Sequence, residues 1–199
     1  MNKQSLPYTV VFSFIVCFAF VFLLSLTHQA TQELVLRNQE LRQQRAVLRA
    51  LTIEYDSDQD VFERFADIEQ VERDGLTLFR ITQDGENIYA SLFSGSGLWG
   101  TINGTISVNE AVDRIVGIEI IDHNETPGLG GRIDEPEFKN QFQGKSLVDG
   151  RIQVVRDGDA EGRDGQVDAV TGATATSRSM ETIINRQLER LQNALGDRA

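Results

Sequence analysis

The sequence predicts an α+β protein, with one apolar helix near its N-terminus followed by a domain of mostly antiparallel strands and packed helices. Seventeen residues from Val10 to Leu26 carry only two polar side chains. From Leu76 onward, several short segments alternate between apolar and polar residues, as half-buried strands do. The stretch 178–195 repeats its apolar residues with the period of an amphipathic helix. Strands followed by such a helix indicate a sheet covered by a helix.

The apolar run is predicted to be a membrane anchor, which we assign to residues 1–30. Extended to Leu6 and Thr27, it would form a helix of about 33 Å, long enough to cross a hydrocarbon core of about 30 Å. A cleaved signal peptide is the alternative. The run ends in L-T-H-Q-A, however, which matches the small-residue cleavage pattern poorly, so a retained anchor is favoured.

The charges beside the anchor do not decide its orientation. Lys3 precedes the run, whereas Arg37, Arg42 and Arg45 follow it. Counting these charges weakly favours a cytoplasmic C-terminal domain, but long domains cross membranes largely regardless of charge. The residues therefore leave both orientations open.

Composition excludes several classes of function. The net charge is −11, and residues 51–199 hold 14 Lys and Arg against 28 Asp and Glu, so nucleic acid and anionic bilayer surfaces are not expected partners. The only cysteine, Cys17, lies in the apolar run, and the two histidines are His28 and His123. We therefore expect no metal site and no catalytic nucleophile, and His123 is interpreted as a surface or loop residue.

Residues 31–75 are predicted to form a stalk helix and an acidic helical segment. Leu34, Leu41 and Leu48 lie one heptad apart, and a stalk continuing the anchor is favoured because one apolar position per heptad is too few for a coiled coil. The acidic residues 54–74 also carry apolar side chains at helical spacing.

The remaining residues, 76–199, are predicted to form one domain. The segments 76–81 and 88–93 flank D-G-E-N, a sequence typical of a β-hairpin. Further strands are predicted over 102–108, 114–122 and 148–156, a short helix before Phe142, and a helix from Arg178 onward.

Two loops have more than one interpretation. Asp157 to Asp168 nearly fits a calcium-binding loop, but its last ligand position is Asp and a strand precedes it, so a solvated acidic turn is favoured. S-G-S-G-L-W-G at 94–100 lacks the Lys-Ser/Thr and the helix of a phosphate loop. It either buries Trp99 beside a bulge or lets Trp99 and the backbone approach a flat ligand.

The stretch D-A-V-T-G-A-T-A-T-S, residues 168–177, holds more hydroxyl groups than one helix cap requires. Thr176 or Ser177 is the expected N-cap of the last helix, which leaves Thr171 and Thr174 unexplained. The small Gly-Ala pair between these two threonines makes a hydroxyl accessible at a helix N-terminus, where a phosphate is stabilised. A capped turn is favoured on the residues alone, and a phosphate-linked site is the alternative.

Two motifs carry a resemblance to a known family. Asp168-x-x-Thr171-Gly172-Ala173-Thr174 resembles the D-x-x-(S/T)-G-A-T signature of periplasmic FMN-binding domains, and E-T-P-G-L-G from Glu125 resembles a second loop of these domains. The resemblance covers most of residues 76–195 and points to the FMN-binding subunits of the Nqr/Rnf family. G-L-W-G-T-I-N-G at 97–104 and E-P-E-F-K-N-Q-F-Q-G-K at 135–145 resemble the C subunits of sodium-translocating NADH:quinone oxidoreductases more than the G subunits of Rnf complexes.

The resemblance implies a covalent flavin site. Thr174 would bear FMN through a phosphoester, and Asp168 would serve recognition by an FMN transferase. The other residues implied are Thr171, Gly172 and Ala173 around the phosphate, Glu125, Thr126, Leu129 and Gly130 along the isoalloxazine, and Leu98 and Trp99 near its face.

The resemblance also implies a function. It predicts a single-pass subunit of the bacterial inner membrane, with a cytoplasmic N-terminus and a periplasmic FMN-binding domain at 76–199. This subunit would carry electrons in a multi-subunit, ion-translocating NADH:quinone or ferredoxin:NAD oxidoreductase, with no catalysis of its own. The alternatives are a stand-alone extracytoplasmic flavin carrier or sensor, and a cofactor-free membrane-anchored interaction protein in which T-G-A-T is only a cap.

Overall fold

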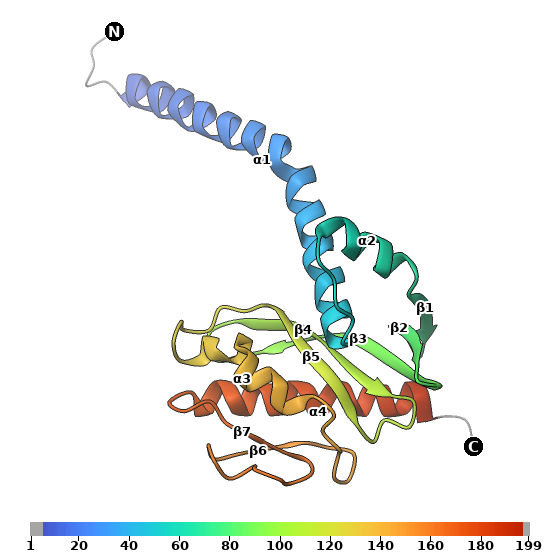
Figure 1. The fold of residues 1–199 in the computed structure, drawn as a ribbon. Coiled ribbons are helices and arrows are strands. Elements are labelled where there is room, and N and C mark those ends of the chain that lie inside the picture. The colour runs from blue at the N-terminus through green and yellow to red at the C-terminus, as the bar shows by residue number, and fades with distance from the viewer. Residues whose placement is uncertain (1–5, 197–199) are drawn as a thin grey trace. The chain divides into compact units, whose positions relative to one another are not determined.

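The computed structural model describes residues 6–196, and the fold is α+β (Figure 1). Residues 1–5 of the predicted anchor, Lys3 among them, and residues 197–199 of the predicted domain lie outside the described part. Contacts divide the chain into a unit of residues 1–40 and a unit of residues 41–199. The elements, in order, are α1 (Leu6–Ala50), α2 (Asp58–Ala66), β1 (Glu69–Arg73), β2 (Leu76–Gln83), β3 (Glu86–Ser96), β4 (Thr101–Asn109), β5 (Ile115–Asp122), the 3₁₀ helix η1 (Gly130–Asp134), α3 (Pro136–Lys139), the 3₁₀ helix η2 (Asn140–Phe142), β6 (Gln153–Val155), β7 (Gln166–Asp168) and α4 (Thr174–Gly196).

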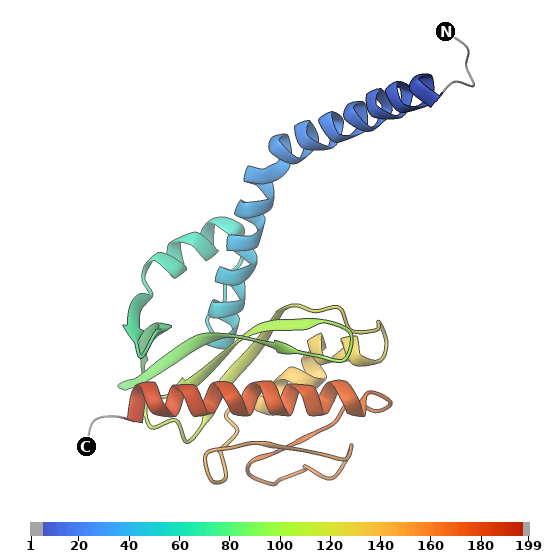
Figure 2. The same ribbon diagram turned by 180° about the vertical axis from the view of Figure 1, so that it is seen from behind.

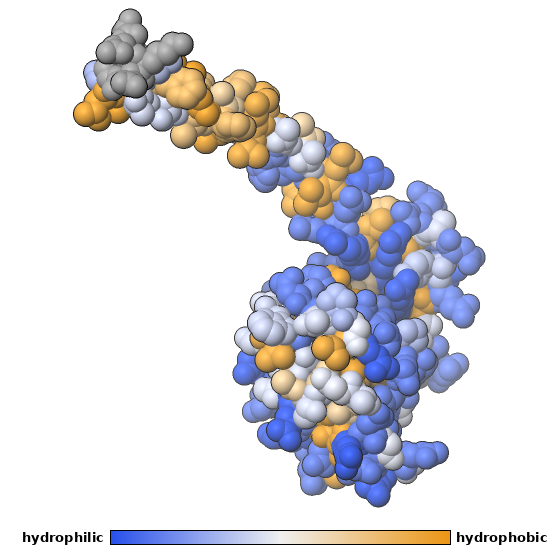
Figure 3. Space-filling model, turned by 90° about the vertical axis from the view of Figure 1, so that its left-hand side faces the viewer, coloured by the Kyte–Doolittle hydropathy of each residue, from blue (hydrophilic) through white to orange (hydrophobic). Residues whose placement is uncertain are grey.

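The first unit consists of helix α1 up to residue 40. This helix is long and apolar enough to cross a membrane, by length and composition. Its apolar side chains are exposed, and Figure 3 shows mainly apolar residues along the first part of the helix and polar residues among apolar ones further along. The anchor run and the predicted stalk thus form one uninterrupted helix.

The second unit is built on a five-stranded antiparallel sheet in the order β1-β2-β3-β4-β5. The predicted hairpin is present: β2 and β3 pair from Gln83 opposite Glu86, and Asp84 and Gly85 adopt φ values of 53° and 81° between them. Positive φ at both central residues is the geometry that an Asp-Gly hairpin turn requires. The prediction of antiparallel strands with packed helices is therefore confirmed.

Helix α4 covers one face of this sheet (Figures 1 and 2). Its residues Met180, Ile184, Leu188 and Leu191 are fully buried, as the 3.6-residue period predicts. The sheet contributes the alternate residues of its strands to the same core, since successive side chains point to opposite faces. Its residues in this core include Leu78, Tyr89, Phe93, Ile102, Ile106, Val108, Ile118 and Ile120.

The opposite face of the sheet packs against the end of α1 and against α2. Val47, Leu48 and Leu51 are buried there beside Phe79 and Ile88. Close approach is possible because β5 carries Gly117 at the contact, where a Cβ atom would lie 2.6 Å from the Ala50 carbonyl oxygen. The same carbonyl accepts a hydrogen bond from the Ser107 hydroxyl of β4. The last turns of α1 are therefore an integral part of the domain.

Three predicted elements differ from the structure. The acidic segment is helical only in α2, and residues 69–73 form the exposed edge strand β1, which an Asp74-Gly75 turn joins to β2. The strand predicted over 148–156 is reduced to β6, which pairs in parallel with the unpredicted β7. The last helix begins at Thr174, four residues before the predicted start. In the first case the helical spacing of the sequence continues into residues that pair as a strand only in the folded domain.

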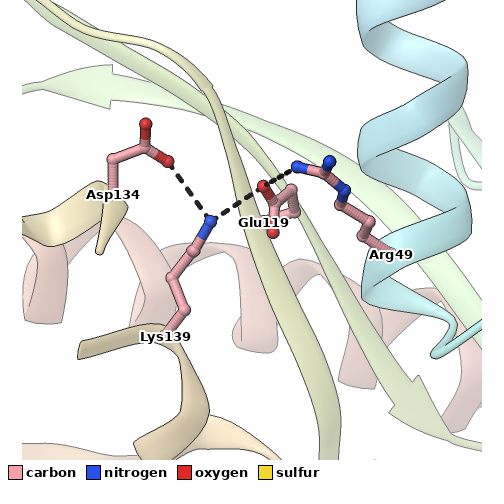
Figure 4. Close-up of polar contacts among 4 residues, drawn as sticks. All are labelled: Arg49, Glu119, Asp134 and Lys139. Atoms are coloured by element: carbon pink, nitrogen blue, oxygen red, sulfur yellow. Dashed lines mark hydrogen bonds and ion pairs between the residues drawn. The ribbon is translucent and has the colours of Figure 1, made fainter. Parts of the chain in front are cut away.

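An ion-pair network around the buried Glu119 carboxylate attaches η1 and α3 to the sheet (Figure 4). The Lys139 ammonium lies 2.8 Å from the Glu119 carboxylate of β5 and 3.3 Å from that of Asp134. The Glu119 carboxylate also accepts from Arg49 of α1 at 3.2 Å. Because η1 directly follows the E-T-P-G-L-G loop, this network fixes the far end of that loop.

Candidate functional site

Thr174, the first residue of α4, is exposed and lines a pocket of about 280 Å³. One wall of the pocket comes from β6 and the residues after it, and the other comes from the T-G-A-T segment and the first turns of α4. The parallel pairing of β6 with β7 holds the two walls together, since Val155 lies opposite Asp168 and accepts from the amide of Ala169 at 2.9 Å. The lining residues are Val154, Val155, Arg156, Asp157, Ala169, Val170, Thr171, Gly172, Thr174 and Arg178.

The Glu125 carboxylate joins three segments that are far apart in the sequence. One oxygen accepts from the backbone amides of Leu98 at 2.8 Å and Trp99 at 3.0 Å, and the other accepts from the Thr176 hydroxyl of α4 at 2.6 Å. The side chain is only 4 % exposed. Glu125 therefore fixes the G-L-W segment and the E-T-P-G-L-G loop to the start of α4.

The environment of Glu125 favours its charged form. Burial raises the pKa of this carboxyl, but the hydrogen bonds from Thr176, Trp99 and Leu98, together with nearby His123, outweigh burial, so the pKa lies below its ordinary value. A carboxylate that accepts three hydrogen bonds is thus ionised at neutral pH.

Two glycines make this packing possible. A Cβ atom on Gly130 would lie 2.5 Å from the Thr176 hydroxyl and 2.7 Å from Glu125 Oε2. A Cβ atom on Gly97 would overlap the other oxygen of Glu125. Gly97 of the G-L-W segment and Gly130 of the E-T-P-G-L-G loop therefore allow close approach to one buried carboxylate.

Large apolar side chains are exposed around this junction. Leu98 is 54 % exposed, Trp99 is 68 % exposed and Leu129 is 48 % exposed. Leu129 reaches the T-G-A-T segment, since its Cδ2 atom would lie 3.4 Å from a Cβ atom on Gly172, which has a φ of 77°. Figure 3 views the end of the domain where α4 begins, and apolar atoms lie among polar ones there. Exposed leucine and tryptophan side chains beside a pocket are typical of a ligand or partner site.

The remaining predicted site residues lie in or under these loops. The exposed Thr126 closes its loop, since its carbonyl accepts from the amides of Leu129 at 3.1 Å and Gly131 at 2.9 Å. Ala173 is buried, and Thr171 donates a hydrogen bond to Asp157. Asp168 lies at the end of β7, where its carboxylate accepts from the amide of Ala160 at 2.9 Å.

The acidic residues of the 157–168 loop do not converge on one point. Asp157 accepts from Thr171, whereas Asp168 accepts from within the loop. Within residues 6–196, no three His, Cys, Asp or Glu side chains are placed to hold a metal ion.

Two residues of the site have roles that differ from those predicted. Thr176 and Ser177, the expected helix caps, are both buried inside α4: Thr176 binds Glu125, and Ser177 accepts from the Val170 amide at 3.0 Å and donates to the Ala173 carbonyl at 3.0 Å. His123, interpreted as a surface or loop residue, does lie in the loop after β5. Its Nδ1 also accepts from the Glu125 amide at 3.1 Å and so supports the loop.

Two arginines of the pocket, Arg156 and Arg178, belong to neither motif, and no pattern in the sequence points to them. The sequence does contain a pattern that distinguishes two of the threonines. The spacing of Thr174 and Thr176 places their side chains on opposite sides of a helix, which could separate an exposed threonine from a buried one.

These residues fit the group that the motifs imply. An exposed threonine hydroxyl at the rim of a pocket can carry a phosphoester, and two arginines line the same pocket. The exposed apolar side chains of Leu98, Trp99 and Leu129 can contact a planar ring system. The two regions meet at Gly172, which lines the pocket and where a Cβ atom would lie 3.4 Å from Leu129 Cδ2.

Comparison with known proteins supports this interpretation. Residues 97–189 match the family model of the FMN-binding domain. The chain is 31 % identical to the C subunit of the Na(+)-translocating NADH-quinone reductase of Pseudomonas aeruginosa, over 62 % of this chain and 50 % of that protein. It is 38 % identical to the corresponding protein of Yersinia pestis, over 55 % of this chain and 44 % of that protein. The chain therefore spans about half the length, or less, of these curated relatives.

A solved structure agrees with the fold. The crystal structure of the C subunit of the Na(+)-translocating NADH-quinone reductase from Parabacteroides distasonis superposes with a TM-score of 0.68 at 26 % identity, covering 82 % of this chain and 94 % of that one. The resemblance predicted from the two motifs is thus confirmed: residues 97–189 match the FMN-binding domain, and the chain resembles the C subunits of the sodium-translocating NADH-quinone reductases.

Proposed function

We propose that this protein is the electron-carrying, FMN-bearing subunit of a sodium-translocating NADH:quinone reductase. FMN, when bound, accepts and passes on electrons, whereas the protein supplies position and polarity. We assign the domain itself no bond-making step on a substrate, since electron transfer through a bound flavin requires none from the protein. The function is therefore that of a relay between other redox groups of the complex.

The FMN is attached to the Thr174 hydroxyl through a phosphoester. An FMN transferase forms this bond from an activated flavin donor of the dinucleotide class, such that the threonine oxygen replaces the nucleotide leaving group on phosphorus. The product has the mass of the protein plus FMN minus one water. Covalent attachment suits a carrier at an exposed site, because a flavin in contact with solvent would otherwise dissociate.

The neighbouring residues have distinct roles in this proposal. Leu98, Trp99 and Leu129 contact the isoalloxazine, whereas Glu125 holds the G-L-W segment without needing to touch the flavin. Gly172 and Ala173 leave room for the phosphate. Asp168 takes part in recognition by the transferase, consistent with its place in the motif and outside the pocket lining.

Helix α1 anchors the domain in the bacterial inner membrane in a single pass. The N-terminus is cytoplasmic and the FMN-binding domain periplasmic, since the family to which the two motifs point carries its flavin domain outside the cytoplasm. The partners are the membrane itself, the other subunits of the reductase and the FMN transferase. The Rnf type of complex is the alternative assembly.

The observation that carries the proposal is the exposed Thr174 of the T-G-A-T motif beside a pocket within the matched domain. The full chain, produced in a host that has the FMN transferase, should show flavin fluorescence after denaturing electrophoresis. Thr174→Ala should abolish the signal, because it removes the attachment oxygen. Thr182→Ala is the matched control, since Thr182 is exposed on the same helix outside the pocket lining. A fluorescent band from the Thr174→Ala variant would refute the attachment site.

A further inference from the structure

The pocket beside Thr174 contains two arginines whose charges are not neutralised by any acidic side chain of the described chain. Arg156 follows β6 and Arg178 lies one turn into α4, and both side chains are exposed. Within residues 6–196, neither makes an ion pair, whereas six arginines of the second unit outside the pocket do. The pocket therefore presents two such arginines together with exposed Thr174, whereas its other threonine, Thr171, donates its hydroxyl to Asp157.

The backbone fixes both arginines relative to Thr174. Thr174 and Arg178 are four residues apart on α4 and so lie on the same side of the helix, one above the other. Arg156 directly follows Val155, which is held against the residues before T-G-A-T by the β6–β7 pairing. The two arginines thus line the same pocket as Thr174 from two different elements.

The one acidic side chain in the pocket lining does not offset these charges. Asp157 lines the pocket as well, but its carboxylate accepts a hydrogen bond from Thr171. The second unit as a whole is strongly acidic, with 28 Asp and Glu against 14 Lys and Arg in residues 51–199. An anion at this position is therefore repelled by the domain unless charges at the site itself attract it.

We propose that Arg156 and Arg178 bind the phosphate through which FMN is joined to Thr174. This inference rests on the proposed function, and it adds two residues that the motifs do not contain. A phosphodiester keeps one negative charge at all physiological pH values, and guanidinium groups form charge-assisted, often bidentate, hydrogen bonds with phosphate oxygens. The arginines are positioning residues, which hold the cofactor by its phosphate and leave the isoalloxazine exposed for electron transfer.

The test compares Arg156→Gln, Arg178→Gln and the double variant with the native chain, produced for the same limited time with the FMN transferase. The first readout is the flavinylated fraction by intact mass, and the second is the ³¹P resonance of the flavinylated protein. Arg186→Gln is the matched control, because Arg186 is exposed on α4 outside the pocket lining and without an ion pair in the described part. All four variants should keep the native melting temperature, since these arginines pack against no core.

Each single substitution should lower the flavinylated fraction severalfold, and the double substitution about tenfold, as expected on losing a charge-assisted hydrogen bond. The ³¹P resonance of the remaining loaded protein should shift in the three pocket variants and stay unchanged in Arg186→Gln. An unchanged resonance in the double variant would overturn the inference, even if less flavin were attached, because the arginines would then contact only the transferase. A native chain without flavin would instead overturn the proposed function.

Discussion

At the scale of single residues, the site depends on Glu125, which the motif resemblance places along the isoalloxazine. The structure gives its carboxylate three protein donors and almost no exposed surface. Two backbone amides donate to the same oxygen of this side chain, and a charged carboxylate accepts such hydrogen bonds more strongly than a neutral amide would. This explains why the residue is an acid. Glu125 thus acts by positioning Trp99.

Glu125→Gln should destabilise the full chain by about 1–2 kcal/mol at pH 7, because the amide keeps an acceptor oxygen but loses the charge. The pKa of Glu125 lies below its ordinary value of about 4.3. The ionised carboxylate therefore contributes fully to the free energy of unfolding above the ordinary pKa. This contribution is lost as the pH falls through the lower pKa of the folded state. Urea unfolding of both proteins in detergent should give free energies of unfolding that differ at pH 7 and differ progressively less as the pH falls below the ordinary value. A difference that stays constant at every acidic pH at which both proteins fold would contradict this role.

Trp99 offers a direct probe, since it is the only tryptophan in the chain and is 68 % exposed. If it contacts the flavin, loading should protect it from the quencher acrylamide. The acrylamide quenching constant should be at least twofold lower for flavinylated protein than for the Thr174→Ala variant from the same host. Equal constants would show that the flavin does not cover Trp99.

At the scale of elements, the Glu119–Lys139–Asp134 network should fix the E-T-P-G-L-G loop through η1 and α3. Lys139→Met should cost about 1–3 kcal/mol, because it leaves the buried Glu119 carboxylate with Arg49 alone. Arg132→Met is the control, since its pairs with Glu135 and Glu137 are at the surface and contribute about 0–1 kcal/mol. Thermal melting of the two variants in detergent tests this difference, and equal losses would refute it.

The elements also show what the sequence can predict. The Asp84-Gly85 turn is recognisable because alternating residues flank it on both sides, and α4 because successive turns repeat one apolar face. The Asp74-Gly75 turn has the same chemistry but follows an acidic stretch with helical spacing, so the sequence predicts helix where strand β1 forms. Strands β6 and β7 have three residues each and pair in parallel, too short for any period to be visible.

The sequence likewise predicts some residues of the candidate site and not others. The T-G-A-T and E-T-P-G-L-G motifs are local, so the sequence reveals them. The bond between Glu125 and Thr176 joins residues 51 positions apart, and its donor resembles a helix cap in the sequence. Arg156 and Arg178 lie on different elements, and only the fold places them around one pocket.

At the scale of the whole molecule, a long apolar helix has its last turns built into a domain that presents one threonine beside an apolar rim. The chain spans about half the length of its curated relatives, and it contains both motifs and a five-stranded sheet. A candidate anchor and a candidate attachment site are thus both encoded in this chain.

The most direct test of covalent FMN attachment is the intact mass of the full chain, purified from membranes of a host that has the FMN transferase, followed by mapping of the modified peptide. We expect a gain equal to one FMN minus one water, on the peptide that contains Thr174. An unmodified mass in that host, or the same gain mapped to another peptide, would contradict the proposed role of Thr174.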